Sequence, residues 1–164
     1  MKQLIAYEDA VDLLDADHTA VKKMFIDYGA LCEDSAPTDH KRALAERICQ
    51  ALTVHAQLEE EIFYPQVRKA IGAADLMDHA LDEHAQAKNV IARIQAMKAT
   101  DAAYDATVTE LGALIDQHVM EEREKIFLKA RLAPLDLRGL TLSLVKRKQQ
   151  LTRKTAPSTA KGTP

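Results

Sequence analysis

Four long amphipathic segments dominate this chain, and each carries a histidine on its apolar stripe. Within each segment, apolar residues recur at alternating steps of three and four, which is the spacing of one face of an α-helix. The predicted helices cover residues 8–33, 39–70, 73–98 and 103–131, and Pro65 is expected to kink the last turn of the second. Because turn residues make the connections short, the sequence predicts an all-α, up-down-up-down antiparallel four-helix bundle.

A fifth, shorter amphipathic segment follows Pro134. Residues 136–151 predict a short C-terminal fifth helix that packs across the bundle or lies on its end. Beyond this helix the chain turns to Thr, Lys, Ala, Pro, Ser and Gly, a composition typical of disorder. We therefore expect one helical bundle domain over residues 1–152 and a disordered tail over residues 153–164.

Composition excludes several classes of protein. A chain of 164 residues with 47% hydrophobic residues is long enough to bury a core of its own. The net charge of −3 gives no general attraction to nucleic acid. No apolar run reaches the ~20 residues of a membrane span, and the N-terminus lacks a signal-peptide pattern. Cys32 and Cys49 form no C-x-x-C pair, so reduced thiols and a cytoplasmic, membrane-free location are expected.

The four histidines on the apolar stripes share one depth in the predicted bundle. His18 lies 15 residues before Glu33, and His84 lies 14 before Lys98. In the oppositely directed helices, His55 lies 16 residues after Asp39 and His118 lies 15 after Ala103. At ~1.5 Å per residue, all four fall within a layer about 3 Å thick. Helix propensity alone does not require this coincidence.

Two of these histidines precede a carboxylate by one helical turn, as His55-x-x-x-Glu59 and His118-x-x-x-Glu122. Residues i and i+4 point about 40° apart on a helix, so each pair faces the same way. Helical period also favours Glu122 over Glu121 for the inward position. Six ionisable groups in one core are unfavourable unless something pairs with all of them, and a metal site would do so. The candidate metal ligands are His18, His55, Glu59, His84, His118 and Glu122.

The number and type of these ligands indicate the kind of site. Six exceed the needs of one tetrahedral zinc and suit two cations about 3.5–4 Å apart, with each carboxylate able to bridge. Imidazole and carboxylate without thiolate favour iron, with manganese and zinc as alternatives. Ferritin-like sites use Glu-x-x-His, whereas here the histidine comes first, at a spacing of four. Such a centre would keep room for a small diatomic or peroxide ligand.

The segments that carry these residues resemble a known family. They are LLDADH ending at His18, HAQLEEEIFYP over residues 55–65, DEHAQAK over residues 82–88 and HVMEEREKIF over residues 118–127. Over about residues 8–150 the chain resembles the hemerythrin-like, HHE cation-binding domain family. The resemblance implies two non-haem iron ions inside a four-helix bundle. It places the ligand role on the six candidates above. Members variously bind oxygen, respond to oxygen, iron or redox state, or handle nitric oxide or peroxide.

One position departs from the family's oxygen carriers. They have an additional histidine four residues before the one on the third helix, and this chain has Ala80 there. The nearest histidine, His79, is five residues before His84 and about 140° away around the helix. Reversible oxygen carriage is therefore less expected than redox or sensing chemistry.

The leading hypothesis is a di-iron protein with an oxygen- or redox-responsive centre that senses, stores or detoxifies oxygen, peroxide or nitric oxide. One alternative is a di-iron enzyme that turns over peroxide or nitric oxide. Another is a helical interaction module. Any signalling would pass through a separate partner protein. No catalytic residue is assigned, because the sequence contains no nucleophile constellation, phosphate loop or dinucleotide fingerprint.

Residues next to the candidate ligands receive more ordinary assignments. Glu60 and Glu61 point away from the direction of Glu59 and are predicted to be surface charges. His79 is predicted to be an exposed or boundary residue. Tyr64 is assigned to packing, with a hydrogen bond near the site as its alternative. Glu83 is a candidate partner for one of the ligands, without a defined position.

Overall fold

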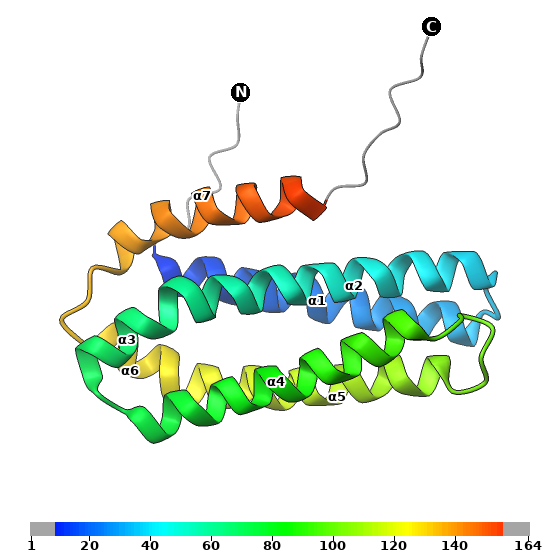
Figure 1. Cartoon of the computed structure of the whole chain (residues 1–164), viewed down its shortest axis with the longest axis horizontal. Coiled ribbons are helices and arrows are strands. Elements are labelled where there is room, and N and C mark those ends of the chain that lie inside the picture. Colours follow the sequence, from blue (N-terminus) through cyan, green and yellow to red (C-terminus); the bar gives the residue numbers. More distant parts are fainter. Residues whose placement is uncertain (1–8, 156–164) are drawn as a thin grey trace, which may run out of the picture.

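The computed structural model of the chain describes residues 9–155. Four long helices, α1 (Ala10–Glu33), α2 (Thr38–Leu58), α4 (Ala74–Ala96) and α5 (Tyr104–Glu121), run antiparallel to their neighbours (Figure 1). Helix α1 contacts α2, α2 contacts α4, α4 contacts α5, and α5 contacts α1, so the four close into a bundle. The predicted all-α antiparallel bundle is confirmed.

Two of the long helices contain a π-helical turn that the sequence period does not predict. Segment η1 (Glu59–Phe63) joins α2 to α3 (Tyr64–Ile71), and η2 (Glu122–Phe127) joins α5 to α6 (Leu128–Leu132). A π turn holds an extra residue and often occurs at a functional site. Pro65 lies in the first turn of α3, so the irregular turn η1 comes directly before the proline and the helix continues beyond it.

Helix α7 (Leu137–Thr155) lies along α1 and α2 and also contacts η1, rather than lying on the end of the bundle (Figure 1). Its Leu144 and Leu151 are buried in the same apolar cluster as residues of α1. The helix continues past the expected boundary at residue 152, so residues 153–155 are helical. The rest of the predicted disordered tail, residues 156–164, lies outside the described residues.

Two apolar clusters fill the bundle, one toward each end. Along α1, Leu14 belongs to the first cluster and Val21 to the second, and His18 lies between them. Along α2, the order is Leu52, His55 and Leu58, with the histidine again between the two clusters. The polar layer is therefore enclosed by hydrocarbon above and below. In the described part of the chain, no helix combines the length and the hydropathy needed to cross a membrane.

Two glycines in different backbone conformations should respond oppositely to alanine. Gly72 follows α3 with φ of +66°, so Gly72→Ala is expected to destabilise the protein by about 1–2 kcal/mol. Gly29 lies inside α1 with no heavy atom within 4 Å of an added Cβ, so Gly29→Ala should stabilise it by about 0.5–1 kcal/mol. Urea unfolding of both metal-free variants measures the difference. Shifts of the same sign would contradict this account of the two positions.

Candidate metal centre

All six predicted ligands meet in the buried polar layer. The two glutamates are 0% and 1% exposed, and the four histidines are 5–6% exposed. Four helices and both π turns contribute side chains to this layer. Each π turn begins at one of the two glutamates. The contributors are His18 of α1, His55 of α2, Glu59 of η1, His84 of α4, His118 of α5 and Glu122 of η2.

The glutamates are shared by two groups of potential metal ligands. Each group contains both glutamates and one pair of histidines, and its ligand atoms lie within 4.8 Å of one another. One oxygen of Glu59 lies 3.0 Å from Nε2 of His55 and 3.3 Å from Nε2 of His84, so it reaches both groups. This arrangement suits two adjacent cations with shared carboxylates. The histidine pairs are His18 with His55, and His84 with His118.

Glu122 spans the same two groups with its two oxygens. Its Oε1 lies 3.1 Å from Nε2 of His18, and its Oε2 lies 3.2 Å from Nε2 of His118. Glu121, one residue earlier, lies outside the centre and contacts His79 instead. The structure thus places Glu122 rather than Glu121 inside, as the helical period predicts.

Each histidine of the centre has a carboxylate partner at its outward nitrogen. The Nδ1 atoms lie 3.1–3.2 Å from these oxygens, so each Nδ1–H can donate outward while Nε2 faces the interior of the centre. Paired Nε2 atoms then face each other at 3.0 and 3.1 Å. A proton or a metal cation between the two facing nitrogens favours this short distance. The partners are Asp15 for His18, Asp17 for His55, Glu60 for His84 and Glu83 for His118.

The prediction that Glu60 is a surface charge is therefore wrong. Glu60 is half-buried, because α4 brings the imidazole of His84 against it. Glu61 is exposed as predicted and pairs with Arg147 of α7 at 2.8 Å. Glu83, which the sequence could not place, accepts the hydrogen bond from His118.

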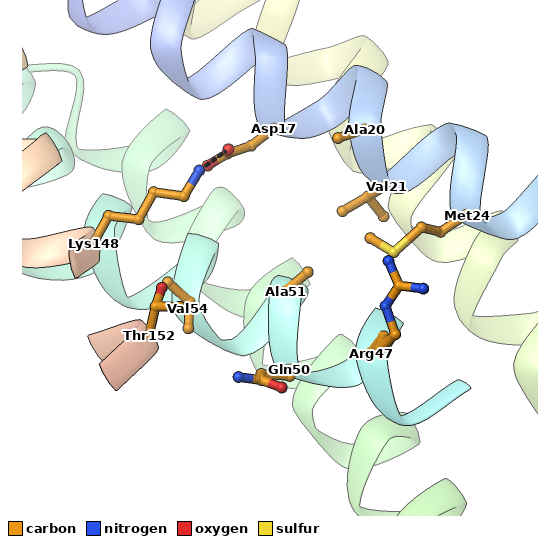
Figure 2. A pocket seen from close by; sticks show the side chains of 10 residues that line it. All are labelled: Asp17, Ala20, Val21, Met24, Arg47, Gln50, Ala51, Val54, Lys148 and Thr152. Carbon is orange, nitrogen blue, oxygen red and sulfur yellow. Dashed lines mark hydrogen bonds and ion pairs between the residues drawn. The ribbon is translucent and has the colours of Figure 1, made fainter. Parts of the chain in front are cut away.

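Lysine or arginine side chains form ion pairs with three of the four carboxylates that contact the Nδ1 atoms of the histidines. These ion pairs orient the carboxylates, and the carboxylates orient the imidazole rings of the four histidines. Figure 2 shows Lys148 extending from α7 to Asp17 beside a groove between α1 and α2, so the fifth helix reaches the partner of His55. The other two ion pairs are Arg123 with Asp15 at 2.6 Å and Lys88 with Glu60 at 2.7 Å.

The centre has a shortage of positive charge. Both carboxylate oxygens of Glu59 and one of Glu122 are buried without a hydrogen-bond partner among the described residues, although imidazole nitrogens lie near them. Burial lowers the pKa of His55, but Glu59 and Asp17 outweigh it and raise the pKa to about 10. Burial likewise lowers the pKa of His118, and the two glutamates raise it to about 11. Groups that attract protons this strongly also attract metal cations.

Tyr64 is a residue of the site that sequence reasoning assigned to packing. Its hydroxyl donates to Oε2 of Glu122 and lies 3.4 Å from Nε2 of His84, and its ring stacks on that imidazole at 5.4 Å. Burial and the charge of Glu122 raise the pKa of this phenol well above its usual value. A regular α-helical period does not place Tyr64 beside Glu59 in the interior, but the intervening π turn does. The hydrogen-bonding alternative is therefore the one observed.

Space for a small molecule lies beside the imidazoles. A cavity of about 30 Å³ touches all four histidines and is otherwise lined mainly by apolar side chains. Separately, an open groove of about 540 Å³, lined by residues of α1, α5 and η2, reaches His18 from the surface. A cavity of 30 Å³ exceeds the minimum for one water, so it has room for a diatomic molecule. Its apolar lining includes Leu52, Ala87, Ile91, Ile115 and Val119.

Comparisons with known proteins agree with this fold and identify a family. The sequence matches the family described as the hemerythrin HHE cation binding domain over residues 9–130. The crystal structure of a hemerythrin HHE cation binding domain-containing protein from Mycobacterium kansasii has a TM-score of 0.72 and 18% identity, covering 89% of this chain and 88% of that one. This likeness supports the fold.

A curated relative, named DNA nickase, comes from Nostoc sp. (strain PCC 7120 / SAG 25.82 / UTEX 2576). It is 28% identical over 120 residues, which cover 73% of this chain and 33% of that protein. The chain thus matches about a third of that relative's length. The family match, in contrast, covers most of this chain, residues 9–130, and includes all six buried residues of the centre. The chain belongs to the hemerythrin HHE cation-binding domain family.

Proposed function

We propose that this protein holds two iron ions in the buried centre and uses them to bind or react with oxygen, peroxide or nitric oxide. The observation that carries the proposal is the pair of histidine groups that share Glu59 and Glu122 in one dry layer. Nitrogen and carboxylate donors without thiolate favour iron over softer-ligand metals, with manganese and zinc as competitors. Bound iron supplies reversible electron transfer and a coordination position for a small ligand.

The side chains of this protein have distinct roles in that proposal. The four histidines are terminal ligands, and their Nδ1 partners hold the rings in place and strengthen the donor nitrogens. Glu59 and Glu122 would each contribute to both cation positions, and the hydroxyl of Tyr64 holds one oxygen of Glu122 in position. The apolar cavity beside the imidazoles admits small uncharged molecules and limits water.

Ala80 favours redox or sensing chemistry over oxygen carriage. It is 2% exposed and provides no donor atom where the family's oxygen carriers have a histidine. The group that contains His84 and His118 would therefore hold a cation with one protein donor fewer, which would leave room for a reacting molecule. This opening also supports the second candidate function, an enzyme that turns over peroxide or nitric oxide. Steady-state assays separate the two candidates, because turnover no faster than that of free iron argues for a binding protein.

Iron analysis combined with an optical spectrum in air tests the proposal. After iron-replete expression, the protein should contain iron and show near-ultraviolet absorption that added azide shifts. The control is His55→Ala, which removes one terminal ligand from the first group. An iron content no higher than that of the His55→Ala variant would defeat the proposal.

A further inference from the structure

A smaller cluster of metal-ligating side chains lies between α4 and α5, outside the buried centre. It consists of His79, Glu83 and Glu121, whose ligand atoms lie within 4.8 Å of one another. Nε2 of His79 is 2.9 Å from an oxygen of Glu121 and 3.7 Å from an oxygen of Glu83. The His79-x-x-x-Glu83 spacing repeats that of the two buried pairs. The imidazole is 55% exposed and the carboxylates are 14% and 21% exposed, so the cluster faces solvent.

The outer cluster forms no salt bridge with lysine or arginine among the described residues. Asp15, Asp17 and Glu60 each form a salt bridge with lysine or arginine. Among residues 9–155, neither Glu83 nor Glu121 does so: Glu83 lies near His79 and His118, and Glu121 lies near His79 and Gln117, with the charge of Lys125 acting on Glu121 at longer range. Two carboxylates around one imidazole form a ligand set, and they attract a divalent cation from solution.

The outer cluster is connected to the buried centre. Glu83 accepts a hydrogen bond of 3.1 Å from Nδ1 of His118, which is itself a ligand of the centre. A cavity of about 10 Å³ is lined by all three residues of the outer cluster and also by His118 and Glu122. Glu122 is 1% exposed, and its Oε1 has no hydrogen-bond partner among the described residues.

Ala80, at the position where the oxygen carriers of the family have a histidine, is one of the residues that line this cavity. The side chain of Ala80 is a methyl group, which provides no donor atom there. The cavity therefore touches both the outer cluster and two residues of the buried centre, His118 and Glu122. The cavity is close to the minimum size for one water, so it suits a cation that has lost most of its hydration shell.

We propose that His79, Glu83 and Glu121 bind a divalent first-row transition cation at the surface and deliver it past Ala80 to the buried centre. The inference rests on the two-cation centre proposed above. The outer site replaces part of the hydration shell of the cation before it enters. Glu122 and His118 then provide the next ligands inward. The cation keeps its oxidation state during this transfer, and no covalent bond changes.

The rate of metal uptake by the full chain tests this proposal. Metal-free protein is mixed with Fe²⁺ without oxygen, and protein-bound iron is measured over time after rapid desalting. The double variant His79→Ala/Glu121→Gln should take up iron about tenfold more slowly than the wild type. Its final iron content should equal that of the wild type, because neither residue belongs to the buried centre. Glu121→Gln alone, a milder change, should slow uptake in the same direction.

A matched control removes the same chemical groups elsewhere. Glu33 and His40 are exposed near the connection between α1 and α2, and Glu33→Gln/His40→Ala should load at the wild-type rate. Circular dichroism confirms that each variant is folded. Loading of both cluster variants at the wild-type rate would overturn the outer site and leave the buried centre intact. Failure of the wild type to take up iron would instead overturn the proposed function.

Discussion

Glu59→Leu is expected to empty both cation positions of the buried centre, whereas His18→Ala should empty only one. Glu59 belongs to both groups of ligands, and His18 belongs to one. The carboxylate is 0% exposed, so no water replaces it as a ligand. Leucine has a similar volume and suits a buried position, so the variant should fold. Bound iron should fall from about two ions per chain to near zero for Glu59→Leu and to about one for His18→Ala.

Metal analysis after identical loading and desalting measures this difference. Glu61→Leu is the matched control, because Glu61 lies two residues away on the same π turn but is exposed and pairs with Arg147. It should bind as much iron as the wild type. If Glu59→Leu and His18→Ala lost the same amount of iron, the two groups would not share this carboxylate.

Phe63→Ala should destabilise the metal-free protein by about 3–5 kcal/mol, the range for removal of a buried aromatic ring. Phe63 is 0% exposed and ends the π turn that begins with Glu59. Its ring packs at 5.7 Å, edge to face, on Phe127, and that ring stacks on His18 at 5.6 Å. The loss therefore removes packing directly beneath the polar layer.

Urea unfolding of the metal-free variants measures this effect, because bound metal would violate two-state behaviour. Leu142→Ala is the comparison, since Leu142 is 76% exposed on α7 and should change stability by less than about 0.5 kcal/mol. A loss below about 1 kcal/mol for Phe63→Ala would show that the core near the π turn repacks freely.

The sequence predicts the bundle and the meeting of the candidate ligands because helical geometry determines both. A rise of ~1.5 Å per residue converts the position of His18 in its segment into a depth, and the same holds for His84 in the third. A spacing of four residues places Glu59 on the same face as His55. These rules need no knowledge of tertiary contacts, and the structure brings these side chains into one layer.

The sequence does not predict features that depend on contacts between helices. Glu60 points away from Glu59 on its own helix, but its role comes from His84 on α4. Tyr64 turns toward the centre because a π turn inserts a residue before it, and Pro65 is the one local signal of an irregular turn. The position of α7, and with it the contact of Lys148 with Asp17, depends on which face of the bundle is left uncovered.

Anomalous diffraction from crystals of the iron-loaded protein tests the central claim most directly. The account predicts two iron peaks about 3.5–4 Å apart, both contacting Glu59 and Glu122. One peak should lie against His18 and His55, and the other should be bound by the second histidine pair. A single peak in this layer, or iron bound only at the surface, would contradict the two-cation centre.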